Sequence, residues 1–386
     1  MRAGAHKTRI TPDSEVFLSG FPRGRRSTGV HDDLWVRCVS LSDGVNTLSL
    51  ATVDLAGLLR EDVEEIAGGL NPGTNEHLLV CATDVHSAPD TLGIFGANSR
   101  QSSVDETYIE RIRSDAIDCI NRSRSNMREA TIKLASFSNP LRIENFRDPG
   151  LVDKGATALY VVDTRGKVIS SIASFASAPV LSDAGNSLIS SDWLNTYYSR
   201  IEERLGGIGI FVKGASGGSL SQVVTVRSFD EAARVGRLAA DAVIAPYAQA
   251  RRMGSPTMSV RETGVKVPME NVMLQALCVM GVMRGNVGKS RSTTVAIARL
   301  GPLTISALPG EVFPEVNFVI KDRMKTPYKI VASLVNDWVG YIVPSPKFDP
   351  SRYEERLSLG RQTSDILLSA LGALLDSEPK QEPPTA

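Results

Sequence analysis

The chain has few cysteines and no paired cysteine motif. A C-x-x-C pair, the usual sign of a zinc ribbon or a thioredoxin-like redox site, is absent. The four cysteines are far apart and lie in apolar surroundings: Cys38, Cys81, Cys119 and Cys278. We therefore expect buried free thiols and neither disulfides nor a cysteine zinc site.

The sequence also lacks net charge and long apolar runs. Lys+Arg and Asp+Glu number 43 each, so no global field would recruit nucleic acid or an anionic membrane. No stretch approaches the roughly 20 apolar residues that span a bilayer, and no apolar signal region follows the charged first residues. We expect a soluble, cytoplasmic protein with a small-molecule partner, no nucleic acid and no membrane insertion. The oligomeric state stays open.

What the chain does contain is material for a large core, with 386 residues and 42% apolar composition. Short runs rich in Val, Ile and Leu predict strands that alternate with amphipathic helices. The strands are expected near 35–41, 47–53, 77–82, 156–162, 168–176, 208–212, 259–267, 293–297, 303–307 and 330–334, and the helices near 60–68, 105–123, 194–205, 230–247 and 363–375. This order predicts an α/β fold of mixed multi-stranded sheets layered with helices.

No linker divides the chain, so we expect one domain over residues 1–376. Residues 377–386 contain three prolines and several charges, which predicts a disordered tail. The Met-rich segment 269–292 is interpreted as an insertion or a flap over a site.

A carboxylate and an imidazole follow the apolar run at 77–82, in Asp84-Val85-His86. Side chains two residues apart on an extended segment project from the same face. An acid and a base at the end of a buried strand are half of a metal or proton-transfer site. A solvated loop carboxylate beside a structural histidine is the alternative.

Nine short motifs, in sequence order over nearly the whole chain, carry a family resemblance. The chain resembles the N-terminal catalytic domain of neutral/alkaline ceramidases and their shorter bacterial relatives, which implies that fold without the C-terminal Ig-like β-sandwich of longer members. The motifs are Arg9-Ile-Thr-Pro12, Gly29-Val-His-Asp32, Val53-Asp-Leu-Ala-Gly57, Thr83-Asp-Val-His-Ser-Ala-Pro89, Ser174-Phe-Ala-Ser-Ala-Pro179, Ile189-Ser-Ser-Asp-Trp193, Lys213-Gly-Ala-Ser-Gly217, Leu308-Pro-Gly-Glu-Val-Phe313 and Asn336-Asp-Trp-Val-Gly-Tyr341.

The resemblance implies amide hydrolysis at a zinc ion held by two histidines, a glutamate and a tyrosine. The glutamate and the tyrosine fall on Glu311 and Tyr341, but one histidine falls on Asp84 and the other on Ala178. Loss of two imidazoles weakens zinc binding. The oxygen donors Asp84, Glu311 and Tyr341 suit Mg²⁺, Mn²⁺ or Ca²⁺ better, so a divalent metal at these three residues, or none, is expected.

Catalytic and substrate-binding roles are also implied. Asp84 and His86 are candidates for proton transfer, and the family's serine motif aligns with Leu220, between the candidate catalytic hydroxyls of Ser219 and Ser221. The substrate-binding candidates are His31, Arg147, Gly217 and Trp338, whose alternatives are a turn, a surface arginine, a turn glycine and a core aromatic.

These features predict a ceramidase-like hydrolase that cleaves an amide or ester bond of a small molecule other than ceramide, with an altered metal site. One alternative is an inactive relative that serves as a ligand-binding or assembly module. Another is a metal-free biosynthetic acyl-transfer enzyme that uses the Asp84 and His86 pair.

Overall fold

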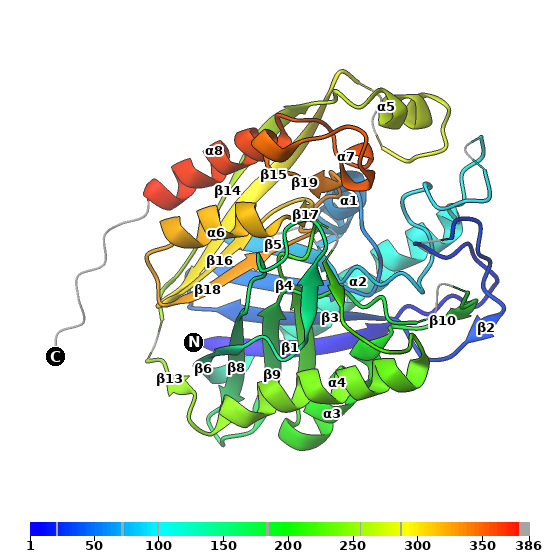
Figure 1. Ribbon diagram of the computed structural model, residues 1–386. Coiled ribbons are helices and arrows are strands. Elements are labelled where there is room, and N and C mark those ends of the chain that lie inside the picture. Colours follow the sequence, from blue (N-terminus) through cyan, green and yellow to red (C-terminus); the bar gives the residue numbers. More distant parts are fainter. Residues whose placement is uncertain are drawn as a thin grey trace.

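Two packed β-sheets form the centre of the molecule, and helices cover the outer face of each. The computed structural model describes residues 1–20, 22–70, 73–98, 100–182, 185–218, 220–254, 256–285 and 288–377, with the backbone alone at 220 and 221. In these ranges the layers run helix, sheet, sheet, helix (Figure 1).

The larger sheet has nine strands and is mixed. Its order is β11-β9-β8-β6-β1-β3-β4-β5, and β13 pairs with β6. The pairs β4–β5 and β9–β11 are parallel and the others are antiparallel. The strands are β1 (Arg2–Arg9), β3 (Trp35–Ser42), β4 (Thr47–Val53), β5 (Glu76–Ala82), β6 (Arg128–Ser138), β8 (Gly155–Asp163), β9 (Val168–Phe175), β11 (Ile208–Lys213) and β13 (Arg251–Arg252).

The smaller sheet has the order β14-β15-β16-β18, and its strands are β14 (Met258–Pro268), β15 (Ser290–Leu300), β16 (Leu303–Ala307) and β18 (Tyr328–Ala332). Three short pairs complete the strands: β2 (Gly29–Val30) with β10 (Leu188–Ile189), β7 (Ile143–Asn145) with β12 (Leu220–Gln222), and β17 (Glu311–Val312) with β19 (Tyr341–Ile342).

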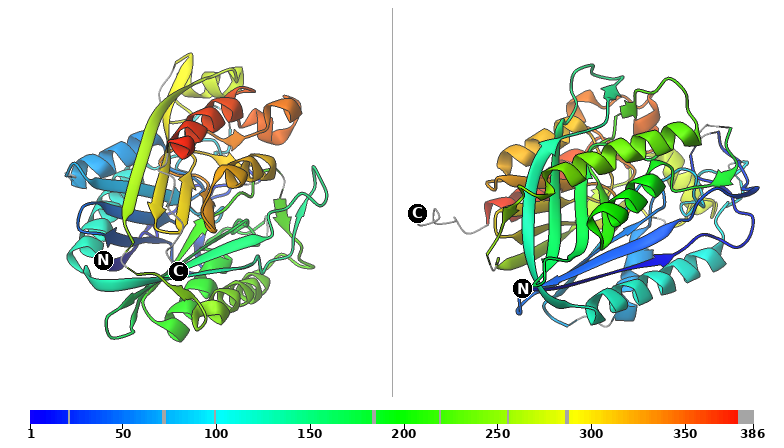
Figure 2. Two further views of the ribbon diagram at one scale, coloured as in Figure 1. Left: turned by 90° about the vertical axis from the view of Figure 1, so that its left-hand side faces the viewer. Right: turned by 90° about the horizontal axis from the view of Figure 1, so that it is seen from below.

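Helices lie on the two outer faces, as Figure 2 shows from two further directions. The large sheet carries α1 (Arg60–Leu70), α2 (Glu106–Ser125), α3 (Trp193–Leu205) and α4 (Phe229–Ile244), and the small sheet carries α6 (Pro314–Arg323) and α8 (Thr363–Asp376). Shorter pieces are α5 (Val272–Val279), α7 (Tyr353–Arg356) and the 3₁₀ turns η1 (Ala245–Tyr247) and η2 (Ser345–Lys347). Within the described residues, no helix is both long and apolar enough to cross a membrane.

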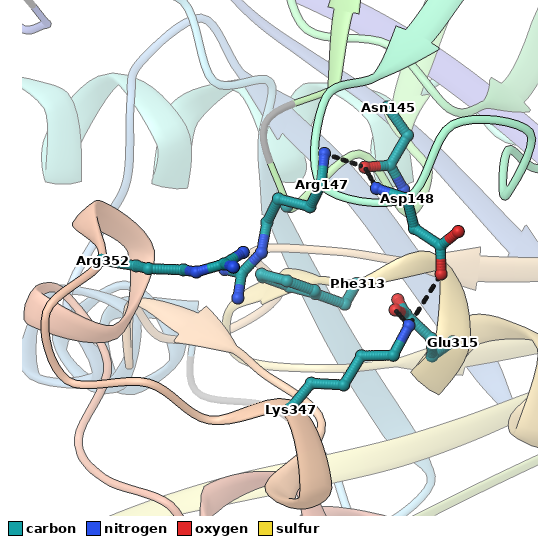
Figure 3. Close-up of a pocket in the computed structure, with 8 residues that line it drawn as sticks. Asn145, Arg147, Asp148, Phe313, Glu315, Lys347 and Arg352 are labelled. Carbon is teal, nitrogen blue, oxygen red and sulfur yellow. Dashed lines mark hydrogen bonds and ion pairs between the residues drawn. The ribbon is translucent and has the colours of Figure 1, made fainter.

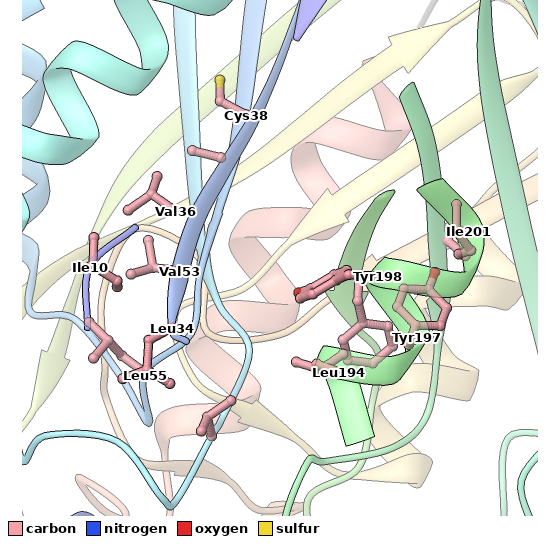
Figure 4. Close-up of a cluster of buried hydrophobic side chains, with 14 of the residues drawn as sticks. Ile10, Leu34, Val36, Cys38, Val53, Leu55, Leu194, Tyr197, Tyr198 and Ile201 are labelled. Atoms are coloured by element: carbon pink, nitrogen blue, oxygen red, sulfur yellow. The ribbon is translucent and has the colours of Figure 1, made fainter. Parts of the chain in front are cut away.

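The strands β4, β8 and β9 of the large sheet are buried on both faces, which explains the apolar runs in their sequences. In β3, Val36 and Cys38 point toward the helices, whereas Val39 and Leu41 point toward the small sheet. Figure 4 shows the first of these cores, with Val36 and Cys38 on one side and Tyr197 and Tyr198 of α3 on the other. The alternation of the β3 side chains between the two faces of the sheet follows from the two-residue period of a strand.

The predicted fold class is confirmed, and every strand and helix expected from the sequence is present within a few residues. The sequence interpretation missed several elements, among them β1, β6 and α6. In β1 and β6 charged residues interrupt the apolar positions, so neither reads as an apolar run. The tail predicted over 377–386 lies outside the described residues beyond Ser377, and no observation bears on the domain limits.

The cysteine expectation is confirmed, because all four thiols are free and buried. Burial raises the pKa of the Cys38 thiol to about 11 and that of Cys81 to about 12.

Since the thiolate is the reactive form, the native protein at neutral pH should react negligibly with a disulfide reagent such as Ellman's. After unfolding in urea, all four thiols should react. Rapid labelling of a native cysteine, located by peptide mapping, would contradict this burial.

Candidate active site

The side chains predicted to share a site lie together, and a lysine joins them. The Lys213 ammonium, at the end of β11, is 3.0 Å from Asp84 Oδ2 and 3.0 Å from Glu311 Oε2. His86 Nε2 is 3.4 Å from the other oxygen of Asp84. Tyr341 is aligned with Glu311 across the parallel pair β17–β19, and burial together with the charge of Glu311 raises the pKa of its phenol. The result is one cluster of polar groups.

A single segment after β18 holds the backbone of this cluster in place. The Ser333 amide donates to Lys213 O at 2.9 Å, and the Ala82 amide donates to Leu334 O at 3.0 Å. The Leu334 amide in turn donates to Gly310 O at 3.1 Å, next to Glu311. These bonds link the ends of β5 and β11, in the large sheet, to the loop after β16 in the small sheet. The cluster therefore lies where the two sheets meet.

The turn at Asp84 brings the acid to the base. Asp84 has φ +67°, a left-handed conformation that a non-glycine residue adopts only when the surroundings enforce it. Its amide donates to Leu55 O at 2.9 Å, which fixes the turn. The expectation of an extended D-x-H segment is therefore wrong at this residue. The contact between Asp84 and His86 comes from a turn and not from strand alternation.

Burial and the neighbouring charges both shift the pKa values of the groups in the cluster. Burial alone would raise the pKa of Asp84, but the Lys213 ammonium and the His86 ring together outweigh it and hold the pKa of that carboxyl below its ordinary value. Burial, reinforced by the negative charge of Asp84, raises the pKa of Glu311. Burial opposes the charge of Lys213, yet the two carboxylates raise the pKa of its ammonium. Asp84 is thus the carboxylate that stays ionised, and Glu311 is the one that takes up a proton more readily.

The lowered pKa of Asp84 predicts a pH dependence of stability. A carboxyl with a folded-state pKa below its unfolded value of 3.8 stabilises the fold above that value, and the contribution is lost as the pH falls through the folded pKa. The difference in unfolding free energy between wild type and Asp84→Asn should be constant above about pH 5 and shrink below about pH 4. Urea unfolding between pH 7 and pH 3 measures it. A difference that grows with acidification would show that Asp84 is not the ionised partner.

His31, which is predicted to bind substrate, makes the contacts of a residue in a turn. Its ring stacks on Phe229 at 3.8 Å between centroids, and its Nδ1 is 2.8 Å from Asp32 Oδ2. Asp32 also accepts hydrogen bonds from Ser190 and Ser191. These contacts are those of the alternative, a turn stabilised by the aspartate. The substrate role of His31 stays a prediction.

Arg147, the second substrate-binding candidate, lies beside the cluster and is internally paired. Its guanidinium makes two hydrogen bonds to Glu355, at 3.1 and 2.7 Å, and one to Glu354 at 3.3 Å. It also lies over the Phe313 ring at 5.0 Å. Only 12% of its side chain is exposed. The alternative interpretation of Arg147 as a surface arginine is therefore excluded. Its binding role stays a prediction.

Gly217 and Trp338 both have packing roles. The Gly217 amide donates to Val312 O at 2.9 Å, so it is not a free donor for a substrate oxygen. A Cβ at Gly217 would lie 3.0 Å from Glu311 O, which explains the glycine. Trp338 is 4% exposed and packs in an apolar cluster with Leu92 and with Leu274 of α5, from the Met-rich segment.

The serine candidates are only partly described. Ser219 lies outside the described residues, and for Ser221 the structure describes the backbone, which pairs with Glu144 between β12 and β7. Their hydroxyls therefore stay predictions.

A polar cavity of about 270 Å³ lies next to the cluster (Figure 3). Its side chains include three cations and two anions, and Figure 3 shows Lys347 reaching toward Asp148 and Glu315. The Phe313 ring lines it and meets the Tyr341 ring edge-on at 6.3 Å between centroids. The lining residues are Asn145, Arg147, Asp148, Gly218, Phe313, Glu315, Lys347 and Arg352. One aromatic layer separates this cavity from the cluster.

The residues of the cluster do not fit a divalent metal. The Lys213 ammonium lies between Asp84 and Glu311, where an ion shared by the two carboxylates would have to bind. At roughly 3 Å and an effective dielectric constant of about 20, a divalent ion and an ammonium repel each other by on the order of 10 kcal/mol. Across the described parts of the chain, no group of three or more His, Cys, Asp and Glu side chains is placed to hold an ion.

Lys213 is the residue that sequence reasoning missed. It belongs to the Lys213-Gly-Ala-Ser-Gly217 motif but was given no role. A signal was present, because Ile208-Gly-Ile-Phe-Val is entirely apolar and a lysine ends that buried strand. Lysine is almost never fully buried unless it is paired, and Lys213 is 0% exposed.

Comparisons with known proteins identify the fold. No protein-family model matches the chain, and no curated protein matches it in sequence. Two solved structures are similar over 100% of this chain, each with a TM-score of 0.81 and 16% identity: neutral ceramidase from Pseudomonas aeruginosa, of which 76% is covered, and a ceramidase complexed with C2, of which 77% is covered. The chain therefore has the fold of neutral ceramidase.

Proposed function

We propose that this protein is a ceramidase-like hydrolase that cleaves an amide or ester bond in a small, polar molecule other than ceramide, without a metal. The observation that carries the proposal is the pair of Asp84 and His86 at the surface end of the buried cluster. The His86 side chain is 36% exposed, whereas that of Asp84 is 7% exposed. The solvent-accessible base His86 is thus paired with the buried carboxylate of Asp84.

In this proposal, His86 takes a proton from an attacking water molecule and Asp84 stabilises the imidazolium that forms. The water oxygen bonds to the substrate carbonyl carbon, and the carbon–nitrogen or carbon–oxygen bond then breaks. His86 returns its proton to the leaving amine or alcohol. The distance of 3.4 Å from His86 to Asp84 is long for a hydrogen bond, as is common for catalytic groups without substrate.

In this proposal the cavity beside Phe313, which one aromatic layer separates from the cluster, holds a small polar or anionic part of the substrate, while the bond to be cleaved lies at His86. Its volume of about 270 Å³ is below the roughly 300–1,000 Å³ of pockets that hold drug-sized ligands. Lys347 and Arg352 line it with cationic side chains that are about half accessible, and each of them also pairs with a carboxylate, Lys347 with Asp148 and Arg352 with Asp349. A ceramide, with two long hydrocarbon chains, does not suit such a lining.

The test is hydrolysis of a panel of short N-acyl amino acids and short-chain esters by wild type and His86→Gln in the presence of EDTA. We expect His86→Gln to lower kcat/KM by roughly 10²–10⁴-fold, the usual contribution of a general base. The control is His6→Gln, because His6 lies in β1, outside the cluster. A wild type that turns over no member of the panel, or an unaffected His86→Gln, would contradict the proposal.

A second candidate function is a ligand-binding module, and the burial of Lys213 favours it. An ammonium that is 0% exposed and paired with two carboxylates is also what a purely structural ion cluster looks like. In that case calorimetry would detect binding of panel compounds to the wild type without any turnover.

A further inference from the structure

A fully buried ammonium is the central group of the cluster. We propose that Lys213 is the permanent cation of this site and excludes a divalent metal from it. Its ammonium takes the place that a metal ion would occupy between two carboxylates. The inference concerns the same site as the proposed function, but its test measures metal binding and not catalysis.

The contacts of Lys213 are those of a bridging cation. Its Nζ lies 3.0 Å from one oxygen of Asp84 and 3.0 Å from one oxygen of Glu311; Asp84 is in the turn after β5 of the large sheet, and Glu311 begins β17 of a separate two-stranded pair. An ammonium has three N–H donors, and two of them are accounted for by these carboxylates. Two buried carboxylates that face each other would otherwise repel, and one would have to be protonated.

The backbone that carries Lys213 is held by hydrogen bonds and close packing. Phe211, two residues earlier on β11, packs against Trp193 and Tyr197 of α3, and the Lys213 carbonyl accepts a hydrogen bond from the Ser333 amide. The adjacent Gly214 amide donates to Phe175 O at 3.1 Å, and a Cβ at Gly214 would lie 2.7 Å from the Phe175 backbone. The end of β11, from which the ammonium extends, is therefore fixed in position.

The ligand set around Lys213 differs from the one that the resemblance implies. Ala178, where the resemblance implies a histidine, has no side-chain donor, and its carbonyl accepts hydrogen bonds from Trp193 and Gln222. His86 is the one imidazole in the cluster. Zinc in proteins is held by about four nitrogen, sulfur or oxygen ligands at 2.0–2.3 Å, which this set provides only if Lys213 leaves.

The experiment is equilibrium dialysis of the full chain against zinc alone, with zinc quantified by elemental analysis and melting temperature recorded with and without zinc or EDTA. The expected result for wild type is less than about 0.1 zinc per chain and no shift in melting temperature with either reagent. Lys213→Ala, if folded, should bind zinc at least tenfold more tightly than wild type, and Lys213→Ala/Glu311→Gln should lose that gain.

Two results would overturn the inference. One is a stoichiometric zinc in wild type that is lost in Glu311→Gln, because the metal would then share the site with the ammonium. The other is a folded Lys213→Ala that binds zinc no better than wild type. Should that variant fail to fold, the wild-type measurement alone decides. Neither outcome depends on hydrolysis, so failure of the proposed function is distinguished from failure of this inference.

Discussion

Lys213→Met should destabilise the folded protein by about 3–5 kcal/mol, the usual cost of removing one partner from a buried ion pair. Methionine matches the length of the lysine side chain but carries no charge. Asp84 and Glu311, whose side chains are 7% and 11% exposed, would then face each other without a cation. The measurement is the free energy of unfolding in urea at pH 7, from the denaturation midpoint and slope.

Two further variants test the cause of that loss. Lys213→Met/Glu311→Gln should recover part of the stability, because it removes one of the two unneutralised charges. Lys7→Met is the matched control. Its ammonium is 2.6 Å from Glu202 but its side chain is 31% exposed, so this pair should contribute at most about 1 kcal/mol. Equal effects of Lys213→Met and Lys7→Met would show that the buried cluster is not a stabilising feature.

Gly340→Ala should destabilise the protein by about 3 kcal/mol or more. Gly340 has φ +73°, and a Cβ there would lie 1.5 Å from the backbone oxygen of Leu357. Strain at positive φ costs about 1–2 kcal/mol, and forcing backbone segments apart typically adds another 1–3 kcal/mol. Because Gly340 O accepts the Glu311 amide at 2.9 Å, the displacement should also move Glu311. Urea unfolding measures the loss of stability.

Gly281→Ala separates the clash from the backbone strain. Gly281 has φ +67°, close to that of Gly340, but a Cβ there meets nothing within 4 Å. It should therefore cost only the strain, about 1–2 kcal/mol. If the two substitutions are equally destabilising, the close approach of Gly340 to Leu357 does not determine stability at this position.

Most of the strands and helices were predictable from sequence, because burial on both faces imposes an apolar run that is visible locally. Residues 47–53 and 168–176 are examples, and β4 and β9 occupy almost the same bounds. The missed strands β1 and β6 show the limit of that signal. Arg2, His6 and Lys7 of β1 make the segment look like a charged terminus, although it pairs with β3 over eight residues.

The composition of the cluster was only partly predictable. A resemblance to ceramidases pointed to Asp84, His86, Glu311 and Tyr341, and the structure places these four together. The residues found at the family's ligand positions led us to expect a divalent metal bound by the oxygens of Asp84, Glu311 and Tyr341, or no metal. The structure instead puts an amine nitrogen between the two carboxylates. The sequence around Asp84 and around Glu311 does not indicate that an amine lies where a metal ion was expected.

The sequence by itself determined the layered α/β architecture and the residue types that reach the strand ends, because hydrophobic periodicity and turn chemistry act over a few residues. Only the tertiary structure decided which charges meet. Lys213 is 98 residues from Glu311, and their contact depends on the hydrogen bonds by which 333–336 joins the two sheets. A buried charge is stable only beside its partners, and the choice of partner is made by the packing of distant segments and not by local sequence.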